Sequence, residues 1–167
     1  VYFLNIFCVQ YSSRSKIVPQ SAIRKLTPYA DEAKRHGIEV YHLNIGQPDL
    51  PTPNEFFEPI KTFHEKVLAY GPSQGIEPLR ITISQYFAKY DIPIEPDEIL
   101  ITVGGSEAIL FSLLVTCNTD DEVLIFEPCY ANYLTLSAIA QVKLIPIPTY
   151  VEDRFHPPPY EELKKLI

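Results

Sequence analysis

The stretch from Glu98 to Ala108, EILITVGGSEA, gives the clearest structural signal in this sequence. Its first half is apolar and rich in β-branched residues, which predicts a strand over 98–102. The glycine pair that follows predicts a tight turn into a helix over 106–117. At the start of such a helix we expect the N–H groups of Ser106, Glu107 and Ala108 to face a bound anion such as a phosphate.

Outward from this stretch, strands and helices alternate toward the C-terminal end. Further strands are expected at 122–126 and 142–147, and a helix at 131–140 separates them. This β-α-β-α-β order predicts an α/β fold with an open, mostly parallel, helix-flanked sheet. Tyr130 follows the second strand, so it should lie at the carboxyl edge of the sheet, where ligands of such folds bind.

The N-terminal half predicts mainly helices and loops. Residues 1–20 show no periodicity and are expected to form an irregular arm, with a flexible polar stretch at 12–16. Thr27 and Pro28 suit the N-cap and first position of a helix that stops at Gly37. The remaining expectations are a strand over 40–45, helices over 54–68 and from Pro78, and a last helix from Tyr160 to Ile167.

Composition restricts the kind of protein. The chain has 167 residues, of which 46% are hydrophobic, and a formal charge of −7, which is typical of a globular protein and disfavours nucleic acid as a partner. No apolar run reaches the roughly 20 residues of a membrane span. The three cysteines form no CxxC pair and are odd in number, so we expect a reducing compartment. The four histidines have no metal-ligand spacing, so we expect no metal site. Because methionine is absent, even at position 1, we expect the sequence to be cut at both ends.

The glycine turn alone is ambiguous. A tight turn between a strand and a helix needs no ligand, and an aromatic residue such as Tyr130 can belong to a core. The turn also lacks the GxGxxG and GxxxxGK spacings of nucleotide sites, so a nucleotide is disfavoured.

Four separated segments together resemble one family. They are LNIGQPD at 43–49, YGPSQGIEPLR at 70–80, GGSEAI at 104–109 and EPCYANY at 127–133. In order and spacing they resemble the N-terminal portion of class I and II pyridoxal-phosphate-dependent aminotransferases, over nearly everything from Ser15 to Ile167. The resemblance implies an incomplete aspartate aminotransferase-like fold (fold type I), with part of a small domain beside the sheet.

The resemblance also implies roles for residues near the glycine turn. Gly105, Ser106 and Glu107 would bind the phosphate of pyridoxal 5′-phosphate through backbone N–H groups, with help from the Ser106 hydroxyl. Tyr130 would stack on the pyridine ring. Arg80, in contrast, is expected to be a surface or salt-bridge residue and not an anion ligand.

Two further positions are implied outside that turn. Gly46 would lie beside the substrate carboxylate, and Tyr70 would reach the phosphate bound by the neighbouring subunit of a homodimer. The implied domain division is an arm over 1–20, part of the small domain over 21–46 and the first part of the large, cofactor-binding domain over 47–167.

The resemblance implies a transferase that moves an amino group between an amino acid and a 2-oxo acid, in cytoplasmic amino-acid metabolism and biosynthesis. In this family the Schiff-base lysine lies beyond position 167, so no catalytic residue is assigned and the chain alone is expected to be inactive. Lys61, Lys89 and Lys143 do not match the family position. Two alternatives stay open: a lyase of the same fold, and a non-catalytic degenerate paralogue or interaction module.

Two local departures from the family pattern stand out. Residues 117–122 lack the Pro-Gly that relatives commonly have before Asp-Glu, so the turn into the next strand loses its glycine and is expected to be strained. Ile81-Thr82-Ile83 places β-branched residues in a helix, which lowers its intrinsic helicity.

Overall fold

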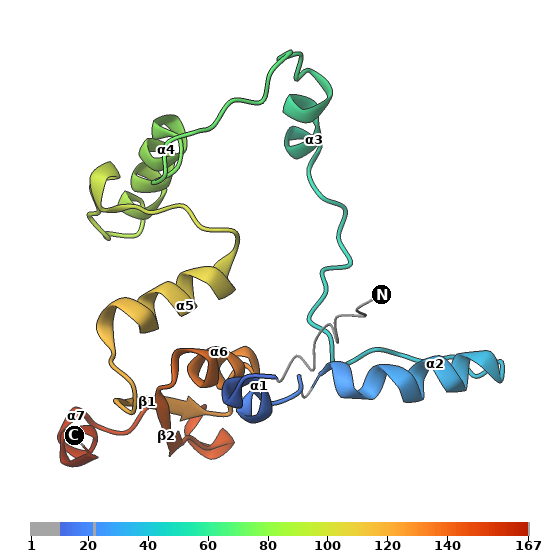
Figure 1. Cartoon of the computed structure of the whole chain (residues 1–167), viewed down its shortest axis with the longest axis vertical. Coiled ribbons are helices and arrows are strands. Elements are labelled where there is room, and N and C mark those ends of the chain that lie inside the picture. Colours follow the sequence, from blue (N-terminus) through green and yellow to red (C-terminus); the bar gives the residue numbers. More distant parts are fainter. Residues whose placement is uncertain (1–10, 22, 167) are drawn as a thin grey trace, which may run out of the picture. The chain divides into compact units, whose positions relative to one another are not determined.

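The computed structural model describes residues 11–21 and 23–166, and its path is drawn in Figure 1. By internal contacts the chain divides into two compact units. One combines the described residues up to Tyr41 with those from Gly104 onward, and the other runs from His42 to Val103. The first half of the arm expected at 1–20, with Cys8, lies outside the described residues.

A β-α-β element forms the centre of the first unit. Strands β1 (Glu122–Glu127) and β2 (Lys143–Pro148) pair in parallel, with Glu122 opposite Lys143 and Glu127 opposite Pro148. Helix α6 (Asn132–Ala140) connects them and packs against β2. The buried apolar side chains among the described residues are those of Leu136, Ala140, Val142 and Ile147. The core of the described part therefore lies between α6 and β2.

Further helices belong to this unit. Helix α5 (Gly105–Thr116) contacts α6, and α1 (Ser13–Ile17) also contacts α6. Helix α2 (Thr27–Arg35) has Pro28 in its first turn and ends before Gly37, whose φ is +75°. The shorter elements are η1 (Arg24–Leu26), η3 (Val151–Asp153), α7 (Tyr160–Leu163) and η4 (Lys164–Leu166).

Helix α1 falls in the segment expected to be irregular. The Ser15 backbone N–H donates to the Ser12 carbonyl over 3.1 Å, and the Ser15 hydroxyl donates to the same carbonyl over 2.7 Å. These short-range bonds hold a single turn without any hydrophobic periodicity, so the polar stretch gave no sign of it. The domain division itself stays a prediction.

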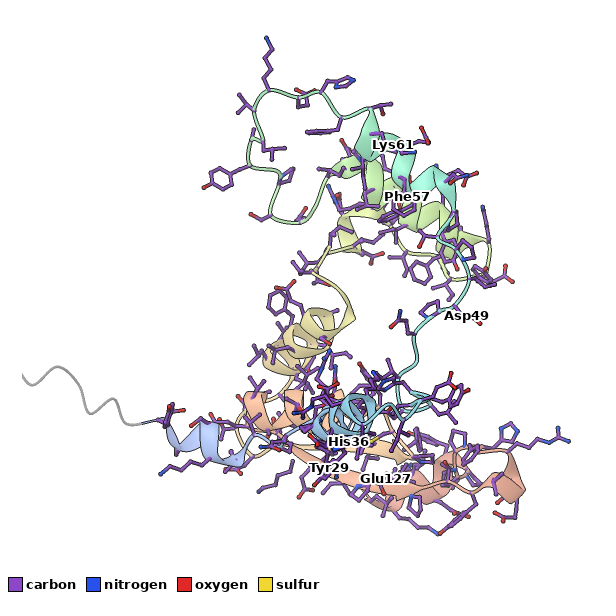
Figure 2. The ribbon with its side chains drawn as sticks, turned by 90° about the vertical axis from the view of Figure 1, so that its right-hand side faces the viewer. Tyr29, His36, Asp49, Phe57, Lys61 and Glu127 are labelled. Atoms are coloured by element: carbon purple, nitrogen blue, oxygen red, sulfur yellow. The ribbon has the colours of Figure 1, made fainter. Side chains whose placement is uncertain are left out.

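The second unit contains α3 (Asn54–Lys61), α4 (Glu77–Ala88) and η2 (Pro96–Glu98). Figure 2 labels Phe57 and Lys61 on α3. Arg80 on α4 is only 8% exposed; its Nη1 donates to the Pro96 carbonyl over 2.7 Å and lies 3.2 Å from Asp97 Oδ1. Of the two expectations for Arg80, the salt bridge is confirmed and the surface position is wrong, because the guanidinium holds the turn at η2 against α4.

The helices expected over 106–117 and 131–140 and from Pro78 are confirmed, as are the strands at 122–126 and 142–147. The strand expected over 98–102 is wrong. A strand needs a ladder of bonds to a neighbour, whereas the Ile101 N–H donates to a loop carbonyl, that of Gln74, over 2.9 Å. The expectation rested on β-branched composition, which does not specify a pairing partner.

Three other boundaries differ from expectation. The strand expected over 40–45 is wrong, because residues 43–45 form a turn. Helix α3 stops at Lys61 and not near Leu68, because the C-cap residue Thr62 has left helical geometry with φ −93° and ψ 3°. Leu68 is 83% exposed. The last helix consists of α7 followed by the 3-10 turn η4.

Candidate cofactor site

The glycine turn before α5 has a backbone conformation that requires glycine. Gly104, the N-cap residue of α5, has φ +82° and ψ 171°. Residues with a β-carbon are essentially excluded from this region by steric clash. Gly104 therefore sets the direction in which α5 leaves the turn.

The first turn of α5 presents hydrogen-bond donors. The Ala108 N–H donates to the Gly104 carbonyl over 3.4 Å, which makes it the first rung of the helix. The expectation that Ala108 offers its N–H to a ligand is therefore wrong, because that donor is used within the helix. The N–H groups of Gly105 and Ser106 precede this rung and point along the helix axis away from its body.

The start of α5 is exposed. A β-carbon placed on Gly105 would meet no atom within 4 Å, and both Gly105 and Ser106 are exposed, while Glu107 is half-buried. Two backbone donors, a hydroxyl and the positive end of a helix of 12 residues form a set of groups that suits a phosphate. The residues present thus fit the phosphate of the implied cofactor.

Tyr130 lies in the same unit, in the short connection between β1 and α6. Its side chain is 54% exposed, and its ring meets that of Tyr133 edge-on with centroids 6.3 Å apart. Figure 2 labels Glu127 at the end of β1, where its carbonyl accepts from the Thr149 N–H over 2.8 Å. The strand end is thus fixed, and three residues later a half-exposed aromatic face is offered to a planar ligand.

A hydrogen bond joins the two parts of the candidate site. The Asn132 side-chain amide, in the first turn of α6, donates to Ser106 Oγ on α5 over 3.3 Å. Tyr130 is two residues before Asn132, so the structure brings Ser106 and the segment of Tyr130 together. Sequence reasoning missed Asn132, although its place in the EPCYANY segment was a usable signal.

An apolar hollow of about 660 Å³ extends from this region between α5 and β1. Its lining includes Ile109, Leu113, Leu124, Phe126, Tyr130 and Tyr133. Other large apolar side chains are exposed nearby in sequence, such as Val115 on α5 at 86%. The site therefore combines a polar helix start with an adjoining apolar surface.

Gly46 and Tyr70 belong to the second unit. Both are exposed, and Tyr70 is fully so. A β-carbon at Gly46 would meet no atom within 4 Å. The roles implied for these two residues stay predictions.

Within residues 11–21 and 23–166, no group of three or more histidine, cysteine or acidic side chains is placed to hold a metal ion. In that same part of the chain no helix is both long and apolar enough to cross a membrane. Lys61 forms an ion pair with Glu58 at 2.9 Å, and Lys143 forms one with Asp120 at 3.3 Å.

Comparison with known proteins places this arrangement in a family. The family model described as aminotransferase class I and II matches residues 38–165, so the chain belongs to that family. It is 32% identical over 157 residues to an aspartate aminotransferase of Pyrococcus horikoshii, and 36% identical over 160 residues to aromatic-amino-acid aminotransferase 2 of Thermococcus litoralis. These alignments cover 93% of this chain but only 39% and 40% of the relatives, so the chain spans about two fifths of their length.

Solved structures agree on the fold. An aspartate aminotransferase of Thermotoga maritima matches with a TM-score of 0.83 at 26% identity, covering 94% of this chain and 42% of that one. An alanine aminotransferase of Pyrococcus furiosus matches with a TM-score of 0.82 at 29% identity, covering 95% and 41%. The chain therefore has part of the aspartate aminotransferase-like fold, which confirms the resemblance read from the sequence.

Proposed function

We propose that this chain is the phosphate-binding, N-terminal part of a pyridoxal-phosphate-dependent aminotransferase. The observation that carries the proposal is the start of α5: a glycine-only turn at Gly104, an exposed Gly105 and a hydroxyl at Ser106. Membership of aminotransferase class I and II supports the identity of the ligand.

Each residue near α5 has a distinct role in the proposal. The N–H groups of Gly105, Ser106 and Glu107 bind the phosphate, and the Ser106 hydroxyl adds a further donor. The aromatic face of Tyr130 would stack against the pyridine ring. When bound, pyridoxal 5′-phosphate supplies an electron sink for negative charge that develops at the α-carbon of an amino acid.

Residues of the second unit complete the proposal. Gly46 donates its backbone N–H to the substrate carboxylate, and Tyr70 gives its hydroxyl to the phosphate held by the other subunit of a homodimer. A tyrosine as exposed as Tyr70 has no intramolecular packing to lose when a second subunit covers it.

The whole protein is proposed to exchange an amino group between an amino acid and a 2-oxo acid in cytoplasmic amino-acid biosynthesis. The domain division is proposed at 1–20, 21–46 and 47–167. The 167-residue chain alone is proposed to be inactive, because no lysine in it matches the family's Schiff-base position. We expect no amino-group transfer when it is assayed with cofactor and a panel of amino-acid and oxo-acid pairs; transfer would show that a lysine within these residues suffices.

Binding to the 167-residue chain tests the phosphate site. Pyridoxine 5′-phosphate is the suitable probe because it lacks the aldehyde, and therefore cannot react with lysines. We expect it to bind roughly ten-fold more tightly than pyridoxine, and Ser106→Ala to remove about three-fold of that difference, since one hydrogen bond contributes about 0.5 to 1.5 kcal/mol.

Equal binding of the two probes would contradict the proposal. In that case the chain would keep the fold of the family without its phosphate site, as a degenerate paralogue does. Thr116→Val is a matched control on the same helix, because the Thr116 hydroxyl donates to the Ser112 carbonyl over 2.7 Å at the opposite end of α5. It should leave both affinities unchanged.

A further inference from the structure

The hydrogen bond between Asn132 and Ser106 links the starts of two helices. Asn132 is the first residue of α6 and Ser106 the second residue of α5, and the amide Nδ2 lies 3.3 Å from Ser106 Oγ. The two residues are 26 positions apart in sequence, so the contact exists only because the fold brings α5 and α6 together.

The hydroxyl of Ser106 is used differently from the other hydroxyls of α5. Ser112 Oγ donates to the Ala108 carbonyl over 2.8 Å, and Thr116 Oγ1 donates to the Ser112 carbonyl over 2.7 Å. Both protons are thus spent on the helix backbone, as is common for such residues inside helices. Ser106 Oγ instead accepts a bond, and within residues 11–21 and 23–166 its own proton has no acceptor.

A hydroxyl has one proton to donate and two lone pairs. Because the Asn132 amide occupies one lone pair, the remaining lone pair and the proton are confined to the other side of the oxygen. We propose that Asn132 is a positioning residue: by donating to Ser106 Oγ, it keeps the Ser106 proton free to be donated to the phosphate. This rests on the proposed function, since it assigns a second residue to the same phosphate site.

A double-mutant cycle tests the inference on the 167-residue chain. Asn132→Ala, Ser106→Ala and the double variant are each titrated with pyridoxine 5′-phosphate and with pyridoxine. We expect Asn132→Ala to weaken binding of the phosphate ester about three-fold and to leave pyridoxine binding unchanged. In the Ser106→Ala background, Asn132→Ala should have no further effect, because the two residues act through one hydroxyl.

Asn132→Asp separates positioning from a purely structural role. Aspartate has the same shape but no donor, so it would accept the Ser106 proton and turn it away from the ligand. An acidic residue in the first turn also favours the helix, so α6 should be at least as well protected from hydrogen exchange as before. We expect Asn132→Asp to weaken binding of the phosphate ester about ten-fold or more. The same substitution made in the Ser106→Ala background should weaken it less, because the hydroxyl that aspartate turns away is then absent.

The outcomes separate the two proposals. If the unmodified chain binds pyridoxine 5′-phosphate no better than pyridoxine, the proposed function fails and the inference fails with it. If the chain prefers the ester but Asn132→Ala binds it equally well, or weakens it independently of Ser106, the inference alone is overturned. Coupled losses confined to the ester support both.

Discussion

Replacing Gly104 by alanine tests whether the backbone conformation at Gly104 sets the start of α5. The substitution adds a β-carbon that would meet no atom within 4 Å, so no loss of stability is expected from a clash with neighbouring atoms. The backbone predicts a large effect, because φ +82° with ψ 171° lies in a region that residues with a β-carbon avoid at a cost of about 1 to 3 kcal/mol. A cost near the middle, about 2 kcal/mol, corresponds to roughly 30-fold in an equilibrium constant.

Amide hydrogen exchange over α5 measures this cost locally. Under conditions where exchange reports the opening equilibrium, Gly104→Ala should speed exchange across the helix roughly 30-fold. The matched control is Gly105→Ala, whose β-carbon also meets no atom within 4 Å and whose φ is not positive. It should slow exchange by up to about five-fold, because alanine is the better helix former by up to about 1 kcal/mol.

Two results would refute the reasoning. Equal effects of Gly104→Ala and Gly105→Ala would mean that the backbone conformation at Gly104 does not limit the turn. Unchanged exchange in Gly104→Ala would mean that the turn relaxes at no cost, and that the direction of α5 is set elsewhere.

Three further predictions concern positions away from the cofactor site. Asp120 has φ +70° and pairs with Lys143 at 3.3 Å. In urea unfolding, Asp120→Gly should be more stable than Asp120→Ala by roughly 1 kcal/mol, because both variants lose the ion pair and only alanine keeps a strained β-carbon. Removing the buried guanidinium in Arg80→Ala should lower the free energy of unfolding by about 2 kcal/mol, because the Pro96 carbonyl loses its donor; a change within 0.5 kcal/mol would contradict this. A hydrogen bond to Tyr90 raises the pKa of Tyr86, so the neutral phenol stabilises the fold below about pH 10, and this stability is lost as pH rises through the raised pKa. Tyr90→Phe should lower the pKa of Tyr86 in an NMR titration of labelled tyrosine.

The sequence was most informative where local signals were strong. The helix starting after Gly104-Gly105 was predictable because a glycine pair after an apolar run marks a turn, and α5 begins at Gly105. The parallel pairing of β1 and β2 was predictable from the β-α-β order alone. Positive φ at Asp120 follows the expectation that this turn had lost its glycine.

Features that depend on contacts distant in sequence were not predictable. Residues 98–102 have strand composition, but a strand also needs a partner, and no local pattern names one. The burial of Arg80 depends on Pro96, 16 residues away, and the Asn132 bond spans 26 residues. Helix α3 ends early because the backbone leaves helical geometry at Thr62, a local change that hydrophobic spacing does not report.

Mapping backbone amide shifts of the 167-residue chain as pyridoxine 5′-phosphate is added is the most direct test of the central claim. We expect the largest shifts at Gly105, Ser106 and Glu107, with ring protons of Tyr130 moving at the same ligand concentration. Shifts centred instead on the polar hollow of about 620 Å³ beside Arg154 and His156 would contradict the account, because the anion would then be bound by side-chain charge and not by the start of α5.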